Sequence, residues 1–232
     1  MAIFGKRQRN SEPVEPEIED NLPAPDGEPG VDRDWDRPVD GPFDIAERPE
    51  LDGLLDLGSM RIPQRPGMEL RLDVEKSTQR LVGVTCGLGP NKVQLQAFAA
   101  PRSSGLWAEI RAALVEGLAK AGGSAEEIES MFGPALQARM PSRSNDGRVV
   151  YQPARFMGVD GPRWFLRVVI NGPAAGRDDS LNDVLSFVRS VVVDRGDEPR
   201  PPRELLELRA PQAVVDAAAA KQAAKQQSEG QA

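Results

Sequence analysis

The sequence contains no histidine and only one cysteine, Cys86, in 232 residues. Without histidine, the chain cannot form Ser-His-Asp or Cys-His catalytic sites, histidine-ligated zinc or haem, or an imidazole pH sensor. A single cysteine excludes an intramolecular disulfide and a thiolate metal cluster. It is also typical of a protein in the reducing cytosol. These absences remove most common catalytic and metal-binding arrangements.

Long hydrophobic runs and nucleotide-binding loops are also missing. The basic start, MAIFGKRQRN, is not followed by the apolar segment of a secretory signal, and no stretch is long enough to span a membrane. The phosphate-binding pattern G-x-x-x-x-G-K-[ST] is absent, and the GLG at 87–89 lacks the third glycine of a dinucleotide fingerprint. We therefore expect a cytoplasmic protein with no membrane span.

Apolar and aromatic residues are scarce, at 39% and 5% of the chain, and acidic charge is concentrated near the N-terminus. Residues 11–50 hold fourteen acidic and three basic residues, whereas residues 51–232 carry a net charge of only +1. A segment so rich in Pro, Glu and Asp buries too little apolar surface to offset its ordering entropy. The nearly neutral remainder lacks the basic character of most nucleic-acid-binding domains.

These composition changes predict three regions. Residues 1–43 are expected to form a disordered, acidic, proline-rich tail, and residues 44–210 a single α+β domain. Residues 211–232, rich in alanine and glutamine, are expected to form a C-terminal tail.

Alternating apolar and polar residues predict strands in two groups. MELRLDVE (68–75), LVGVTCGL and KVQLQAFAAP form the first group, because one face of each is apolar. ALQARMP, RVVYQPARFMGV and RWFLRVVIN form the second. They are separated by NDG (145–147) and DGP (160–162), and Asp-Gly between extended segments is a strong hairpin signal.

Two amphipathic segments predict the main helices. LWAEIRAALVEGLAKAG has apolar residues at spacings of three and four, and so does DSLNDVLSFVRSVVVDRG. SAEEIESMFG shows a capping box and predicts a short further helix. Residues 44–63 indicate a short helix or irregular segment against the domain, and LLELRAP within 197–211 indicates an edge strand. The predicted fold class is therefore α+β. It has a single antiparallel sheet of about six strands in the order strands-helix-strands-helix, with two main helices packed on it.

No catalytic, cofactor-binding or metal-binding residue is predicted, and catalysis is not the favoured role. Asp73 and Glu75 fall on the solvated face of a strand, and the aspartates at 178–183 suit a helix start. These carboxylates leave acid–base or magnesium chemistry open, but no convergent site is evident. Cys86 lies on an apolar strand face, which is typical of a small buried hydrophobe.

Arginine and aromatic residues cluster at two strand-to-helix regions. Arg102 and Arg111 flank Trp107, and Arg163 precedes Trp164. Such groups can grip an anion or stack on a base, whereas the simpler alternative is that the tryptophans fill the core and the arginines are solvated. In DGPRWFLRVVINGPAA, alternation puts Trp164 with Leu166, Val168 and Ile170 on one face, and Arg163, Phe165, Arg167 and Val169 on the other. The predicted contact residues are Arg102, Trp107, Arg163, Phe165 and Arg167.

Several segments resemble an uncharacterised actinobacterial family, known only as domain of unknown function 3710. They are the start MAIFGKR, the acidic tail, LDLGSMRIP, LQAFAAPRSSGLWAEIR and DGPRWFLRVVINGPAA. The resemblance covers roughly residues 44–210 and the short start motif. It implies an actinobacterial cytoplasmic protein and carries no known activity, cofactor or catalytic residue.

Three functional hypotheses follow. The first is a non-catalytic binding or adaptor protein that holds a protein partner, with the acidic tail giving solubility, autoinhibition or a second contact. The second is a binder of, or an enzyme on, a small anionic metabolite, with Arg102, Trp107, Arg163 and Trp164 converging where the two loops meet. The third is weak nucleic-acid contact through the basic start and arginine-rich loops.

Overall fold

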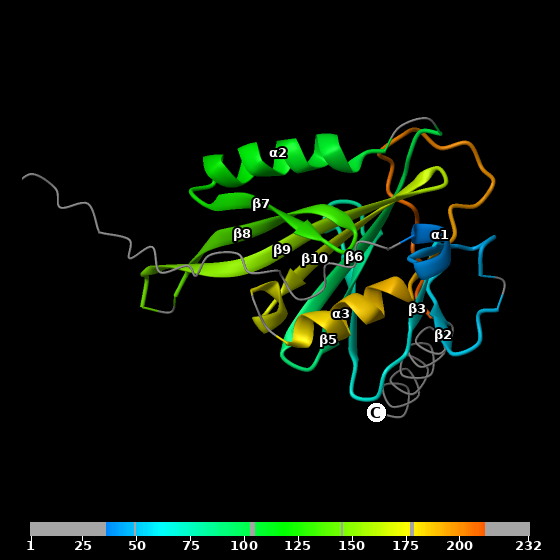
Figure 1. Ribbon diagram of the computed structural model, residues 1–232, viewed down its shortest axis with the longest axis horizontal. Coiled ribbons are helices and arrows are strands. Elements are labelled where there is room, and N and C mark those ends of the chain that lie inside the picture. The colour runs from blue at the N-terminus through cyan, green and yellow to red at the C-terminus, as the bar shows by residue number, and fades with distance from the viewer. Residues whose placement is uncertain (1–35, 49, 103–104, 145, 177–178, 212–232) are drawn as a thin grey trace, which may run out of the picture.

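A seven-stranded antiparallel sheet forms the centre of the fold (Figure 1). The computed structural model describes residues 36–48, 50–102, 105–144, 146–176 and 179–211. The strand order is β4-β5-β6-β10-β9-β8-β7. The strands are Glu69–Val74 (β4), Leu81–Leu88 (β5), Asn91–Ala99 (β6), Ser124–Ser130 (β7), Gly133–Arg143 (β8), Val149–Gly161 (β9) and Trp164–Asn171 (β10). Neighbouring strands are consecutive in sequence except β6 and β10, so this one long-range pairing joins the two halves of the sheet.

A smaller four-stranded sheet has the order β1-β11-β3-β2. Its strands are Phe43–Asp44 (β1), Leu54–Asp56 (β2), Met60–Pro63 (β3) and Val192–Val193 (β11). β1 and β11 are parallel, and the other neighbours are antiparallel. The small sheet therefore joins the beginning of the described chain to the segment after the last helix.

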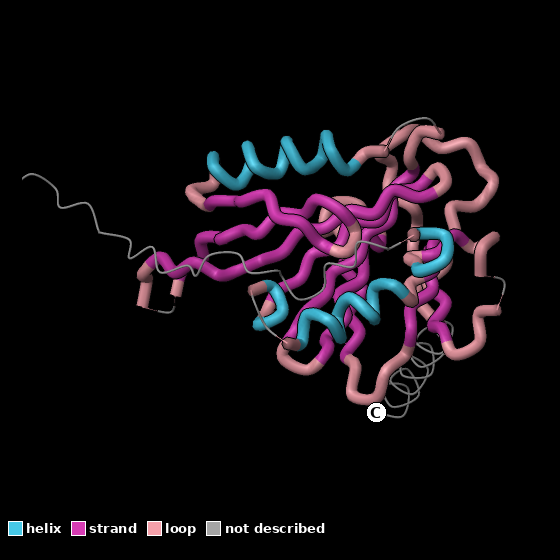
Figure 2. Tube along the Cα trace, viewed as in Figure 1, coloured by secondary structure: helices cyan, strands magenta, loops and turns pink. Residues whose placement is uncertain are grey.

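The helices lie on opposite faces of the large sheet (Figures 1 and 2). They are Arg37–Asp40 (α1), Trp107–Lys120 (α2), the 3-10 turn Pro173–Ala175 (η1) and Ser180–Arg189 (α3). α2 packs on β7, β8 and β9. α3 and residues of the small sheet pack against the other face, so the fold has three layers with the large sheet in the middle.

Each face of the large sheet has its own hydrophobic cluster. The α2-side cluster includes Trp107, Leu118, Leu136, Phe156 and Phe165, and the α3-side cluster includes residues of α3, β3 and β11. Strand β10 contributes to both. The predicted alternation is confirmed, because Trp164, Leu166, Val168 and Ile170 lie in the α3-side cluster while Phe165 and Val169 lie in the α2-side cluster.

The prediction of a single sheet of about six strands is wrong, because the described residues form two sheets, of seven and four strands. Two segments supply the unexpected strands. Residues 44–63, expected as a short helix or irregular segment, form β2, β3 and part of β1. The last helix ends at Arg189, so Val192 and Val193 pair as β11 instead of continuing it. Consecutive β-branched valines favour an extended backbone over a helix.

The short helix predicted for SAEEIESMFG is also wrong. Residues 124–130 form β7, which pairs antiparallel with β8 along its whole length. The Ser-x-x-Glu pattern favours a helix start only locally, and seven paired residues in a hairpin outweigh it. Gly133, the last residue of SAEEIESMFG, begins β8 with a φ of 85°.

The two main helices and both Asp-Gly hairpins are confirmed as α2, α3 and the β8–β9 and β9–β10 connections. Residues 36–43, expected in the N-terminal tail, contribute α1 and the start of β1. The predicted edge strand LLELRAP appears as two isolated bridges, Gly58 with Leu208 and Phe98 with Leu205. Residues 1–35 and 212–232, which hold most of the predicted tails, lie outside the described residues.

Candidate functional site

Three of the five predicted contact residues lie together on the α2 side of the sheet. The Trp107 ring stacks on Phe165 with centroids 6.1 Å apart and an interplanar angle of 20°. Phe165 contacts Phe98 at 6.0 Å, and the Arg167 guanidinium lies 5.8 Å from the centroid of the Phe98 ring. Trp107 is 5% exposed and Phe165 is fully buried. The aromatic part of this row is therefore core packing rather than a contact surface.

Arg167 belongs to a polar row that continues across β6, β5 and β4. Burial lowers the pKa of the Arg167 guanidinium, which donates a hydrogen bond to the side-chain oxygen of Gln96. Further along the row, Thr85 and Gln94 each donate to the Asp73 carboxylate at 2.8 Å. The Asp73 carboxylate thus has its partners within the row, which fits a structural role. The buried Nε–H of Arg167, in contrast, has no hydrogen-bond partner among the described residues.

Arg102, Arg163 and Trp164 are not part of that row. Arg102 is exposed, and Arg163 lies in the β9–β10 turn with a φ of 63°. Trp164 is fully buried on the opposite face, where its indole N–H donates to the Asp44 carboxylate at 2.8 Å. Trp107 and Trp164 are thus separated by the sheet. The four residues expected to converge on an anion do not share one site.

The far end of the β8–β9 hairpin is a surface that the sequence patterns did not predict. Strands β8 and β9 run past their outer neighbours, and the hairpin projects from the sheet (Figures 1 and 2). Val149 and Tyr151 are 57% and 58% exposed, and Met140 and Val150 are also exposed. Large apolar side chains gathered on a projecting element mark an interaction site more often than isolated exposed ones do.

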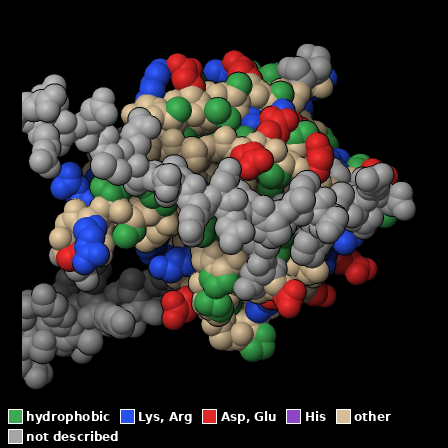
Figure 3. Space-filling view, turned by 60° about the vertical axis from the view of Figure 1, so that its left-hand side comes forward, with side chains coloured by type: hydrophobic (Ala, Val, Ile, Leu, Met, Phe, Trp, Pro, Cys, Tyr) green, Lys and Arg blue, Asp and Glu red, His purple; other side chains and the backbone are tan. Residues whose placement is uncertain are grey.

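The strand register shows which side chains share a face of this projection. Arg139 pairs with Pro153, Pro141 with Tyr151, and Arg143 with Val149, all on the face that α3 covers closer to the centre of the sheet. We call these residues the hairpin surface: Arg139, Pro141, Arg143, Val149, Tyr151 and Pro153. Figure 3 shows hydrophobic and basic side chains next to each other at this end of the molecule.

The hairpin surface has a local excess of positive charge. Within the described part of the chain, neither Arg139 nor Arg143 has a carboxylate partner, whereas nearby Arg148 pairs with Asp146 at 2.7 Å. Arg139 and Arg143 therefore lie beside Tyr151 and Val149 without a carboxylate to neutralise them. An apolar surface flanked by unpaired arginines can bind a segment that carries both apolar and acidic side chains.

One sequence signal points to this surface. RVVYQPARFMGVDG is longer than its predicted strand neighbour RWFLRVVIN. When two paired strands differ in length, the end of the longer strand extends past the shorter one. The apolar Val-Val-Tyr run breaks alternation in the overhang, and Pro153 cannot donate to a ladder there.

Among the described residues, no helix is long and apolar enough to cross a membrane. In the same residues no three Cys, Asp or Glu side chains gather as a metal site would require.

The comparisons with known proteins agree with the resemblance drawn from the sequence motifs. No curated protein matches the chain. Residues 41–217 match the family described as "Protein of unknown function (DUF3710)". The match begins next to α1 and runs past the last bridge, at Leu208, so it includes both sheets. The chain belongs to this family of proteins of unknown function, DUF3710.

Proposed function

We propose that the protein is a non-catalytic binding module that holds a protein partner through the hairpin surface. The observation that carries this proposal is the exposure of Tyr151 and Val149 beside Arg139 and Arg143 on a projecting hairpin. Tyrosine and arginine are enriched at the centres of protein interfaces, because each combines a large contact area with a polar group. A projecting hairpin presents them without rearrangement of the sheet.

The surface favours a partner segment with acidic and apolar side chains. The two unpaired guanidiniums attract carboxylates and form bidentate hydrogen bonds with them. The partner's apolar side chains cover Val149 and the ring of Tyr151. Nucleic acid fits less well, since the hairpin surface has a single aromatic residue and residues 51–232 carry a net charge of only +1.

A non-catalytic role is supported by the positions of the candidate chemical groups. The Asp73 carboxylate is engaged by Thr85 and Gln94. Cys86 is buried. Asp183, another of the carboxylates that left acid–base chemistry open, pairs with Arg65 at 2.6 Å. We place the protein in the cytoplasm because its lone thiol needs no oxidising compartment.

The test places a photo-crosslinking amino acid at Val149 in the full chain inside its native cell. A control variant of the same chain carries the crosslinking amino acid at Val115, which is exposed on α2. We expect a discrete crosslinked protein at Val149 that is absent at Val115, and mass spectrometry then identifies it.

The identified partner is purified, and its affinity is measured against variants. Val149→Thr with Tyr151→Ser is expected to weaken binding at least tenfold, whereas Val115→Thr leaves it unchanged. Neutralising both arginines, as Arg139→Gln with Arg143→Gln, should abolish most of the salt dependence of association. A crosslink that disappears after nuclease treatment, or affinity that the hairpin variants leave unchanged, would refute the proposal.

A further inference from the structure

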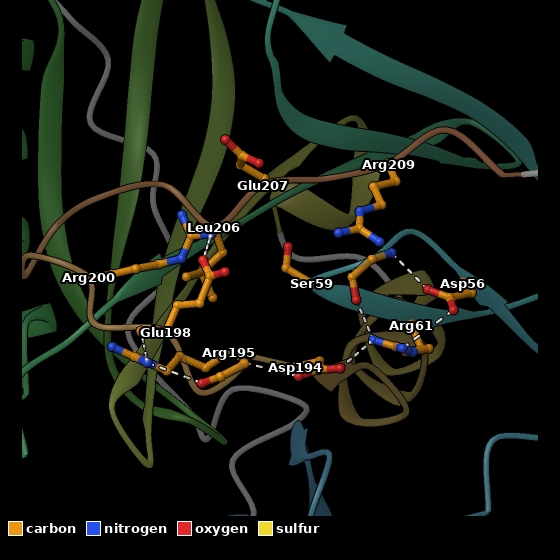
Figure 4. Close-up of a pocket in the computed structure, with 12 residues that line it drawn as sticks. Asp56, Ser59, Arg61, Asp194, Arg195, Glu198, Arg200, Leu206, Glu207 and Arg209 are labelled. Atoms are coloured by element: carbon orange, nitrogen blue, oxygen red, sulfur yellow. Dashed lines mark hydrogen bonds and ion pairs between the residues drawn. The ribbon is translucent and has the colours of Figure 1, made fainter.

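A pocket of about 340 Å³ lies at the edge of the small sheet, away from the hairpin surface (Figure 4). Three segments line it: residues 56–61 around the β2–β3 turn, residues 194–200 after β11, and residues 206–209. This volume is within the range of pockets that hold small molecules. Its walls come from chain segments far apart in sequence.

Most charged groups of the pocket are paired with one another. Arg61 contacts the carboxylates of Asp194 at 3.0 Å and Asp56 at 3.4 Å. Across the pocket, Arg200 pairs with Glu204 at 3.0 Å and with Glu198 at 3.5 Å. These ion pairs hold two walls of the pocket in place. Arg61 and Arg200 therefore already have carboxylate partners within the protein.

Arg209 is different, because its guanidinium has neither a carboxylate partner nor a hydrogen bond among the described residues, whereas Arg195 donates to the backbone carbonyl oxygens of Gly196 and Glu198. Its backbone N–H donates to the carbonyl oxygen of Leu57 at 2.7 Å, which holds its strand segment beside the β2–β3 turn. Its side-chain stem crosses Gly58 so closely that an added Cβ there would lie 3.2 Å from the Arg209 Cγ. The backbone and this close approach direct the guanidinium over the turn.

The side chain of Arg209 extends toward the hydroxyl of Ser59 (Figure 4). That hydroxyl is buried and makes no hydrogen bond within the described residues. A buried unsatisfied hydroxyl destabilises its site, and an acceptor that reaches it recovers the lost interaction. Arg209 is exposed, so its side chain can turn aside to admit such an acceptor.

We infer that the pocket binds a small molecule through a carboxylate group. One carboxylate oxygen accepts from the Arg209 guanidinium and the other from the Ser59 hydroxyl, and the rest of the molecule lies toward Arg195 and Arg200. A hydrogen bond from a guanidinium to a carboxylate oxygen is charge-assisted, and it is stronger in a partly dry pocket than in water.

The charge of the pocket selects a carboxylate over a phosphate. Four arginines (61, 195, 200 and 209) and four acidic residues (56, 194, 198 and 207) line it, so its own charge is zero. A carboxylate brings a charge of −1, whereas a phosphate monoester brings about −1.5 to −2 near neutral pH, close to four carboxylates that repel it. A singly charged ligand therefore fits better.

The experiment follows the arginine Nε–H signals of the full chain by NMR during titration with sodium acetate. Parallel titrations use sodium phosphate and sodium chloride at matched ionic strength. The Arg209 signal is identified as the one missing from Arg209→Lys. We expect it to shift and saturate with a millimolar dissociation constant for acetate, since a ligand of four heavy atoms binds weakly. Chloride should give no saturation, and phosphate should bind more weakly.

Two variants locate the site. Arg209→Gln should abolish saturable binding, and Ser59→Ala should weaken it roughly tenfold, as expected for loss of a hydrogen bond to a charged group. Arg148→Gln, on the distant hairpin, serves as the matched control and should bind acetate as the wild type does. Retained backbone spectra show that each variant is folded. Absence of saturation, tighter binding of phosphate, or unchanged binding in Arg209→Gln or Ser59→Ala would overturn the inference.

Discussion

The carboxylate of Asp160 accepts a hydrogen bond from the backbone N–H of Leu106, 54 residues away in sequence, at 2.7 Å. Its other oxygen lies 3.4 Å from the backbone nitrogen of Trp107, the first residue of α2. Leu106 occupies the N-cap position and provides no side-chain hydrogen bond. Strand β9 therefore supplies the cap that the helix sequence lacks, and it fixes the start of α2 on the sheet.

Removing this cap should destabilise the protein. Asp160→Ala is expected to lower the free energy of unfolding by about 1 kcal/mol, and Asp160→Asn by less, because it keeps one oxygen acceptor. Urea denaturation measures both. Asp52→Ala, at an exposed turn position, is the control, and an Asp160→Ala protein as stable as this control would contradict the assigned cap.

Two glycines should respond to alanine in opposite directions. A Cβ on Gly158 would overlap the rings of Trp107 and Phe165, whereas a Cβ on Gly117, within α2, meets no atom within 4 Å. Gly158→Ala should cost about 1–3 kcal/mol from overpacking. Gly117→Ala should add about 0.5–1 kcal/mol, because alanine favours the helix. Thermal and urea unfolding compare them, and equal effects in the two variants would contradict the close packing of Trp107 and Phe165 over Gly158.

Cys86 should be unreactive in the folded protein. Burial raises the pKa of its thiol to about 12, and the charge of Asp73 adds to the effect. Iodoacetamide at pH 8 should leave the native protein unlabelled and modify the urea-unfolded chain fully, because the thiolate is the reactive form. Rapid labelling under native conditions would show that the thiol is accessible.

The same thiol makes folding stability sensitive to alkaline pH. The folded pKa lies above the unfolded value of about 8.5, so the folded state holds its proton more tightly. This contribution is complete below pH 8.5 and is lost as the pH rises toward 12. Stability of Cys86→Ala should consequently fall less between pH 9 and 11 than that of the wild type.

The N-terminal segment should loosen in acid. Two hydrogen bonds from Arg37, at 2.6 and 2.7 Å, lower the pKa of the Glu47 carboxyl, as does the Asp44 backbone N–H. A lowered folded pKa stabilises the protein above the unfolded value of about 4.3, and that contribution is lost as the pH falls through the folded value. Hydrogen exchange at the amides of Phe43 and Ile45 should therefore show less protection at pH 3.5 than at pH 5.5, after correction for intrinsic rates.

Glu47→Gln should remove that pH dependence. Glu50→Gln, at an exposed position with no hydrogen bond among the described residues, should retain it. Equal pH dependence in both variants would exclude the Glu47 carboxyl as the source.

The local hydrophobic pattern was sufficient to predict those elements whose buried face is determined by their own sequence. The alternation in β10 and the stripe of α2 predicted buried faces because one strand or one helix carries the whole signal. β7 and β11 were missed because their conformation depends on pairing with distant or longer partners. Capping motifs and helical periodicity hold no information about those partners.

The candidate site was harder to predict for the same reason. Arginine–tryptophan proximity in sequence suggested one site, yet a β-strand sends adjacent residues to opposite faces, and Trp164 and Phe165 separate accordingly. The hairpin surface depends on where β8 and β9 outrun their neighbours. The pocket depends on Gly58 meeting Arg209, a contact between the two ends of the domain. Neither relationship is visible in any single stretch of the chain.

Strand β10 has consequences for how the molecule unfolds. Its side chains enter the clusters on both faces of the sheet, and it is paired on both edges, with β6 and β9. If either outer layer detached, one face of β10 would be exposed to solvent while its other face still packed against the remaining layer. We therefore expect the two layers to unfold as one cooperative unit, with the amides of β10 exchanging with solvent only when the whole domain opens.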